Sequence, residues 1–144
     1  MKNICVLGAT GSIGLNTLEV VSLHPDKYKV FALSANTDWE KMLELCKLHE
    51  PAYAVMVDPN SAEHLDKLVP EGVTVLSGEE ALSEVAVHKQ TDYIMAAIVG
   101  SAGMSSTLAA AEAGKRIMLA NKESLVLAGN LLMNAVKKLS LIHI

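Results

Sequence analysis

The chain has 144 residues, of which 51% are hydrophobic and 19% are charged, a composition typical of one folded domain rather than of a disordered chain. Its formal net charge of −4 argues against a basic nucleic-acid or membrane surface, and no apolar run reaches the roughly 18 residues of a membrane span. No signal peptide precedes the first strand pattern, and Cys5 and Cys46 lack the spacing of a metal or redox pair. We therefore expect a cytoplasmic protein that binds neither nucleic acid nor membrane.

Short apolar runs alternate with helical patterns along the chain. The expected strands are Ile4–Leu7, Val30–Leu33, Ala54–Val57, Val73–Leu76, Tyr93–Ile98 and Ile117–Ala120. The expected helices are Ser12–Leu23, Trp39–His49, Ser61–Leu68, Glu79–Ala86, Ser105–Ala113 and Ser124–Lys138. Such alternation predicts parallel strand–helix–strand units with right-handed crossovers. We expect residues 1–138 to form one domain of the α/β class, with a Rossmann-like doubly wound, mostly parallel sheet and helices on both faces.

The junction between the first strand and the first helix carries a glycine-rich motif. Glycines at positions 8, 11 and 14 form a Gly-x-x-Gly-x-x-Gly variant of the dinucleotide-binding fingerprint. The first glycine permits a tight turn, the second lets the backbone approach a pyrophosphate, and the third lets helix and strand pack closely. Free N–H groups at the helix start would bind phosphates, and Thr10 and Ser12 would add hydroxyl donors. The motif therefore predicts a nucleotide site rather than a tight turn without function.

The end of the second strand bears on the choice of cofactor. An NAD enzyme would place Asp or Glu about 20 residues beyond the fingerprint, where the carboxylate binds the ribose 2′-hydroxyl. Residues 33–38 instead read Leu-Ser-Ala-Asn-Thr-Asp, and neither Ser34 nor Ala35 would repel a 2′-phosphate. The pattern favours NADP, although no Arg or Lys stands close by. We expect Asp38 to cap the helix that begins at Trp39 rather than to contact the cofactor.

Two later segments follow strands at the carboxyl edge of the sheet, where ligands bind in open α/β folds. Small residues at 100, 102 and 103 form an expected loop that would lie against a nicotinamide ring, or would simply allow close helix packing. Asn121, Lys122 and Glu123 follow the last expected strand. Lys122 could meet a substrate phosphate, and the other two could hold the nicotinamide ribose or amide. The alternative is a helix N-terminus with solvated charges.

Other residues that could bind a ligand are interpreted as structural. The histidines at 24, 49, 64 and 88 are dispersed without ligand spacing, so we expect surface or capping roles for them. One side of the expected helix at 39–50 is apolar, which indicates core packing and not a cofactor site. The apolar residues on or near that side are Met42, Leu43, Leu45, Cys46 and Leu48.

Three motifs resemble the 1-deoxy-D-xylulose 5-phosphate reductoisomerase family. They are the glycine motif at 8–14, Met-Ala-Ala-Ile-Val-Gly at 95–100 and Leu-Ala-Asn-Lys-Glu-Ser-Leu-Val at 119–126, and the similarity runs from Met1 to about Lys138. The resemblance implies an NADPH-dependent oxidoreductase of non-mevalonate isoprenoid biosynthesis. Such enzymes rearrange and reduce the phosphosugar 1-deoxy-D-xylulose 5-phosphate to 2-C-methyl-D-erythritol 4-phosphate. It also implies Mg or Mn at the substrate's oxygens and a homodimer for the full-length protein.

The resemblance also implies roles for individual residues, by position. Family members have further cofactor contacts where 36–38 stand here, and Gly, a basic residue and Asn are common at these positions. NADPH contacts are expected at Thr10, Gly11, Ser12, Ile13, Asn36, Asn121 and Glu123, and a substrate contact is expected at Lys122.

Family members continue past the helix at 124–138 into metal ligands, a catalytic domain, a lid and a C-terminal helical domain. We therefore expect the chain to be a fragment that binds NADPH and catalyses nothing alone, without catalytic or metal-ligating residues of its own. The apolar residues 139–144 are expected to be a non-native or truncated tail. Two alternatives stay open: a stand-alone NADP-binding sensor module, and another NADP-dependent oxidoreductase of the aspartate-semialdehyde dehydrogenase kind.

Overall fold

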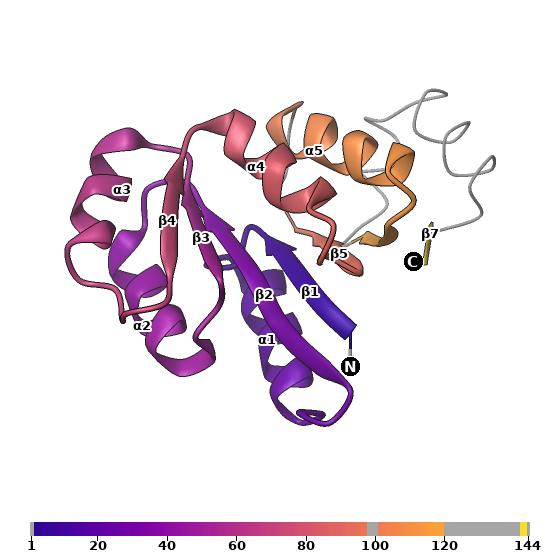
Figure 1. The fold of residues 1–144 in the computed structure, drawn as a ribbon, viewed down its shortest axis with the longest axis horizontal. Coiled ribbons are helices and arrows are strands. Elements are labelled where there is room, and N and C mark those ends of the chain that lie inside the picture. The colour runs from indigo at the N-terminus through magenta and orange to yellow at the C-terminus, as the bar shows by residue number, and fades with distance from the viewer. Residues whose placement is uncertain (1, 98–100, 120–141, 144) are drawn as a thin grey trace.

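The computed structural model describes residues 2–97, 101–119 and 142–143, which form a parallel sheet flanked by helices (Figure 1). The strands are β1 (Lys2–Leu7), β2 (Tyr28–Ala35), β3 (Tyr53–Met56), β4 (Thr74–Ser77), β5 (Tyr93–Ala96), β6 (Arg116–Leu119) and β7 (Ile142–His143). The helices are α1 (Ser12–Ser22), α2 (Trp39–His49), α3 (Pro59–Asp66), α4 (Glu79–Val87) and α5 (Ser101–Glu112).

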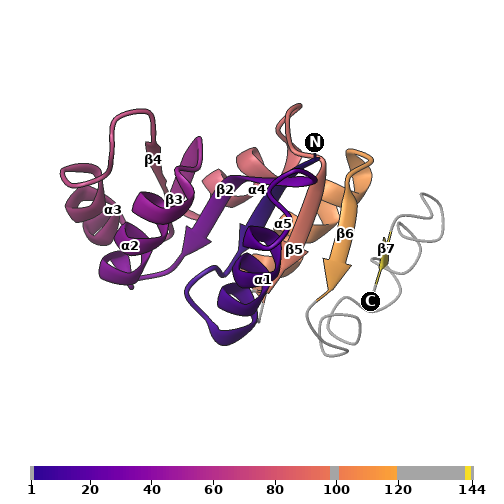
Figure 2. The same ribbon diagram turned by 90° about the horizontal axis from the view of Figure 1, so that it is seen from below.

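Helices cover both faces of the sheet, in two groups (Figure 2). On one face, α1, α2 and α3 bury Leu18, Met42 and Leu65 in a cluster with side chains of β1 to β3. On the other face, α4 and α5 bury Leu82 and Ala110 against β1, β2, β5 and β6. Strands buried on both faces need apolar side chains on both faces, which explains the near-continuous aliphatic runs. The expected Rossmann-like α/β sheet is confirmed.

The strand order reverses at β1. The sheet runs β4-β3-β2-β1-β5-β6-β7, and all its described pairs are parallel. The chain thus builds outward from β1 to β4 and then crosses back to β5 on the other side of β1. The carboxyl ends of β1 and β5 pair at Leu7 and Ala96, and the Ala97 N–H donates to the Leu7 carbonyl at 2.9 Å. Ligands of open α/β sheets bind at such a switch point, and here the loop that begins at Gly8 lies there.

The start of α5 differs from expectation. The sequence pattern predicts a small-residue loop at 100–103 and a helix from Ser105, but α5 begins at Ser101. Ala102 and Gly103 therefore lie in the first turn of the helix. Small residues are a weak signal for a loop, because alanine has the highest helix propensity of all residues. The expected strand ends at Ile98 and Ala120 and the expected helix Ser124–Lys138 lie outside the described residues.

The expectation that Leu48 packs in the core is wrong. Its side chain is 74% exposed, whereas Met42 and Cys46 are fully buried and Leu45 is nearly so. At about 100° per residue, Leu48 lies roughly 120° around α2 from Met42, beyond the arc between Leu45 and Cys46. The hydrophobicity of Leu48 predicts a buried side chain, but its angle around α2 places the side chain on the exposed face of the helix.

Part of the apolar tail has a strand partner. Ile142 and His143 form β7, which pairs in parallel with Ile117 and Met118 of β6. The origin of residues 139–144 stays a prediction.

Of the helices that the structure describes, none combines the length and apolar character needed to cross a membrane.

Candidate cofactor-binding site

The turn after β1 requires glycine at two of its three glycine positions. Gly8 has a φ of +83°, in the left-handed region that side chains with a Cβ disfavour. A Cβ on Gly14 would overlap the carbonyl oxygen of Gly8 and stand 2.7 Å from the Cα of Ala9. The close approach of α1 to the end of β1 therefore depends on Gly14. The roles predicted for the first and third glycines are confirmed.

Gly11 has a different environment from the other two glycines. Its φ of −79° is ordinary for any residue, and a Cβ there would meet only the carbonyl oxygen of Gly8, at 3.7 Å. Nothing in the described protein demands glycine at this position. The space on this side of the turn suits the close backbone approach of a ligand, which is the role predicted for Gly11.

The start of α1 presents unpaired backbone donors. Gly11 is the N-cap residue and supplies no side-chain cap, and the first intrahelical hydrogen bond runs from the Leu15 N–H to the Gly11 carbonyl at 2.9 Å. Among the residues that the structure describes, the N–H groups of Thr10, Ser12 and Ile13 have no protein acceptor. Free N–H groups and the positive end of the helix dipole together form a phosphate-binding site.

The next three helices begin differently. Asp38 caps α2 and Asp58 caps α3, each through its side chain, and α4 has Glu79 and Glu80 in its first turn. A capping carboxylate satisfies free N–H groups, and any carboxylate in the first turn would repel a phosphate. The first turn of α1 has no acidic residue. Within α1 to α4, only α1 is therefore suited to an anionic ligand.

Ser34 of β2 holds the glycine turn in place. Its side chain is fully buried, and its Oγ accepts a hydrogen bond from the Gly8 N–H at 3.0 Å. Its carbonyl accepts a second one from the Ala9 N–H at 2.7 Å. The Ser34 hydroxyl thus binds the backbone of the turn. A single hydroxyl residue within the apolar run Val30–Ala35 was the available signal for this contact.

The residues after β2 are fixed by backbone contacts. The Asp58 N–H donates to the Asn36 carbonyl at 3.1 Å, which ties this tip to the start of α3. The Asp38 carboxylate accepts from the Lys41 N–H at 3.1 Å and so caps α2, as expected. The Asn36 side chain stays exposed at the same sheet edge as the glycine turn. It is therefore placed to donate to a ligand there.

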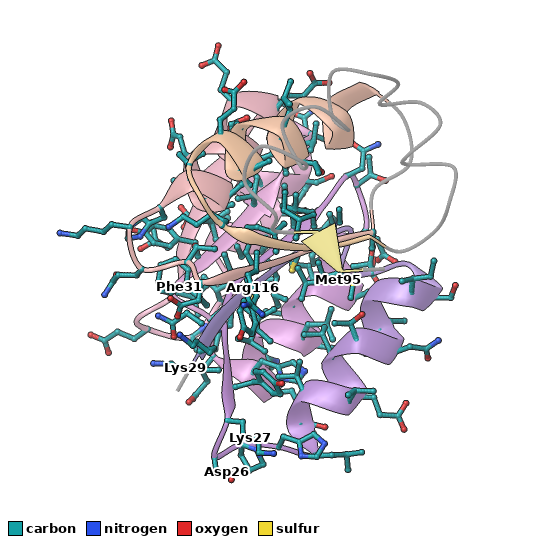
Figure 3. All side chains as sticks on the ribbon, turned by 90° about the vertical axis from the view of Figure 1, so that its right-hand side faces the viewer. Asp26, Lys27, Lys29, Phe31, Met95 and Arg116 are labelled. Atoms are coloured by element: carbon teal, nitrogen blue, oxygen red, sulfur yellow. The ribbon has the colours of Figure 1, made fainter. Side chains whose placement is uncertain are left out.

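Three labelled basic side chains lie away from this edge. Lys27, Lys29 and Arg116 stand at the amino ends of β2 and β6 (Figure 3). The eight residues of β2 separate that end from the glycine turn by roughly 25 Å. These cations do not reach a phosphate bound at α1.

An apolar groove of about 360 Å³ runs beside α1. Its lining includes Ile13, Val20, Tyr28, Tyr93 and Met95 and carries no charged side chain. Because Tyr28 and Tyr93 begin their strands, the groove extends toward the amino edge of the sheet. Its apolar lining does not suit phosphates, although the groove adjoins the glycine turn at Ile13.

The described residues form no metal centre. No group of three His, Cys, Asp or Glu side chains within them could hold a metal ion. Both cysteines are buried, and burial raises the pKa of Cys5 to about 12 and that of Cys46 to about 11. These thiols stay protonated at neutral pH and act as core residues, as expected for Cys5. The divalent metal that the resemblance implies does not fit this part of the chain.

The structure brings only part of the predicted site together. Thr10 to Ile13 lie at the start of α1, and Asn36 lies at the end of the neighbouring strand. Asn121, Lys122 and Glu123 lie outside the described residues.

Comparisons with known proteins agree with this geometry. The family model described as 1-deoxy-D-xylulose 5-phosphate reductoisomerase matches residues 4–129. The 1-deoxy-D-xylulose 5-phosphate reductoisomerase of Vesicomyosocius okutanii is 60% identical over 138 residues, which cover 96% of this chain and 36% of that protein. The chain thus spans about a third of the length of the curated relatives it matches.

Solved structures of the same name match this fold. A DOX-P reductoisomerase in complex with NADPH, fosmidomycin and magnesium matches with a TM-score of 0.88 and 44% identity, over 96% of this chain and 34% of that one. The enzyme from Zymomonas mobilis in complex with NADPH matches with a TM-score of 0.89 and 41% identity, over 96% and 37% of the two chains. These matches favour the reductoisomerase resemblance over a stand-alone sensor or an enzyme of the aspartate-semialdehyde dehydrogenase kind. The chain belongs to the 1-deoxy-D-xylulose 5-phosphate reductoisomerase family.

Proposed function

We propose that this chain is the NADPH-binding portion of a 1-deoxy-D-xylulose 5-phosphate reductoisomerase. The observation that carries the proposal is the uncapped start of α1 at the switch point, where Thr10, Ser12 and Ile13 offer free N–H groups. The pyrophosphate would bind these donors and lie against Gly11. Support comes from two relatives of known structure that are described as complexes with NADPH.

The same proposal includes a preference for NADPH over NADH. At the tip of β2, Ala35 and Asn36 carry no carboxylate, and the carboxylate of Asp38 is engaged as the cap of α2. An NAD-specific site would need a free carboxylate here for the ribose 2′-hydroxyl. The exposed Asn36 amide can instead donate to a 2′-phosphate. Asn121 and Glu123 are proposed as further NADPH contacts.

The full-length enzyme is proposed to isomerise and reduce 1-deoxy-D-xylulose 5-phosphate, with NADPH as the hydride donor and Lys122 as a substrate contact. Family membership supports this reaction, and two related solved structures contain magnesium. Mg or Mn as the metal, a homodimeric assembly and a cytoplasmic location belong to the same proposal. The described residues hold no metal cluster. As the resemblance implies, we expect this chain alone to bind cofactor without turning over substrate.

The experiment is a titration of the chain with NADPH and with NADH, followed by the fluorescence of the reduced nicotinamide. NADPH should bind more tightly than NADH, and Gly11→Val should abolish binding because the branched side chain fills the space next to the pyrophosphate. A Cβ at this position has room, so the variant should stay folded, and its melting temperature is measured in parallel. Unchanged NADPH affinity in Gly11→Val would remove the phosphate site from α1.

A further inference from the structure

The buried hydroxyl of Ser34 is unusual for its position. A hydroxyl in a strand buried on both faces is unfavourable unless it forms hydrogen bonds. Ser34 is 0% exposed between Leu33 and Ala35, and its Oγ accepts a hydrogen bond from the Gly8 N–H, which lies 26 residues away along the chain. The hydroxyl therefore has one identifiable purpose within the described structure, which is to bind the glycine turn.

The contact reaches the start of α1 through one residue. The Gly8 N–H donates to Ser34 Oγ, and the Gly8 carbonyl accepts from the Gly11 N–H at 3.4 Å. The same carbonyl faces the Cα of Gly14, where no Cβ would fit. A rotation of Gly8 would therefore displace both Gly11 and the first turn of α1.

We infer that Ser34 is a positioning residue for the cofactor's pyrophosphate. Its Oγ accepts a hydrogen bond from the Gly8 N–H, and its carbonyl accepts one from the Ala9 N–H, so Ser34 fixes the path of the turn. The next donors, at Thr10, Ser12 and Ile13, are then left unpaired at the start of α1. This inference rests on the proposed function, because it needs a phosphate ligand at that helix end.

The test compares NADPH dissociation constants of the 144-residue chain and three variants, at a temperature where all are folded. Ser34→Ala removes the acceptor and should weaken NADPH binding about tenfold, the effect of one lost hydrogen bond on an equilibrium. Ser34→Thr keeps the hydroxyl and should restore affinity to within about twofold of the parent. The matched control is Thr91→Val, which removes another buried hydroxyl bond, from Thr91 Oγ1 to the Val85 carbonyl at 2.8 Å, far from the turn. It should lower the melting temperature without changing NADPH affinity.

The outcomes separate the inference from the proposed function. If the parent chain does not bind NADPH, the proposed function fails. If the parent binds and Ser34→Ala binds equally well, or if Thr91→Val loses as much affinity, only the positioning role fails. If Ser34→Ala does not fold, Ser34→Cys takes its place, because a thiol of similar size is a weaker acceptor. Parent-like affinity in the thiol variant would then overturn the inference.

Discussion

Gly11 and Gly14 belong to one motif but serve different ends. Gly14 is needed by the fold, because a Cβ there would collide with the backbone of the turn. Gly11 has room for a Cβ, so the fold does not require glycine there, and we propose that a bound pyrophosphate does. A single substitution at each position therefore separates stability from cofactor binding.

Gly14→Ala should destabilise the chain by about 1–3 kcal/mol, the usual effect of forcing extra atoms into a packed site. Gly11→Ala is the matched control and should change the free energy of unfolding much less. Urea denaturation of both variants measures the difference. Equal losses at the two positions would contradict the assigned packing of α1 against the turn.

The half-buried His49 should make the free energy of unfolding depend on pH. It is half-buried in the last turn of α2, and burial lowers its pKa below the ordinary 6.5. The unfolded chain therefore binds a proton more readily than the folded one, so stability rises with pH. The free energy of unfolding should fall on acidification through 6.5, and His49→Gln should reduce that dependence. Parallel pH profiles for the parent and the variant, from urea denaturation, would show that the histidine titrates alike in both states.

At the scale of the element, helix starts divide into capped and uncapped ones. Asp38 satisfies the first turn of α2, and Asp58 that of α3, where its carboxylate also accepts from the Ser61 hydroxyl at 2.8 Å. α1 keeps its donors free at the carboxyl edge of the sheet. The same backbone geometry thus stabilises one helix by a cap and equips another for a ligand.

Asp38→Ala should lower the free energy of unfolding by about 1 kcal/mol, since it removes an N-cap. Asp38→Asn keeps a capping oxygen and should stay near the parent. Neither variant should weaken NADPH binding, because the carboxylate is engaged by α2 and not by the cofactor. A loss of NADPH affinity in Asp38→Ala comparable to that of Gly11→Val would place Asp38 in the cofactor site instead.

Local patterns predicted the elements well because strand and helix periodicities are local. The Asp38 cap and the glycine turn were predictable for the same reason, since each depends on residues a few positions apart. The role of Ser34 is not predictable from local patterns, because its hydrogen-bond partner Gly8 lies 26 positions away, in the loop after β1. The exposure of Leu48 is not predictable from its hydrophobicity, because hydrophobicity does not specify an angle around the helix. The start of α5 was missed because small residues suit both loops and helices.

At the scale of the whole molecule, the position of the turn matters as much as its sequence. Alternating elements predict a doubly wound sheet, but they do not specify which strand lies at the centre. The strand order places β1 between β2 and β5, so the turn after β1 lies at the reversal point. There it is supported by β2 through Ser34 and meets the end of β5 through Ala97. The proposed ligand site depends on this arrangement together with the glycine motif.

The most direct test of the NADPH site follows the backbone amides of the isotope-labelled chain by NMR during NADPH addition. The account predicts that the largest shift changes fall on Thr10 to Gly14, with smaller ones at Asn36, and that NADH leaves Asn36 less affected. Changes confined to the groove beside α1, at residues such as Val20 and Tyr28, with none at the glycine turn, would contradict it.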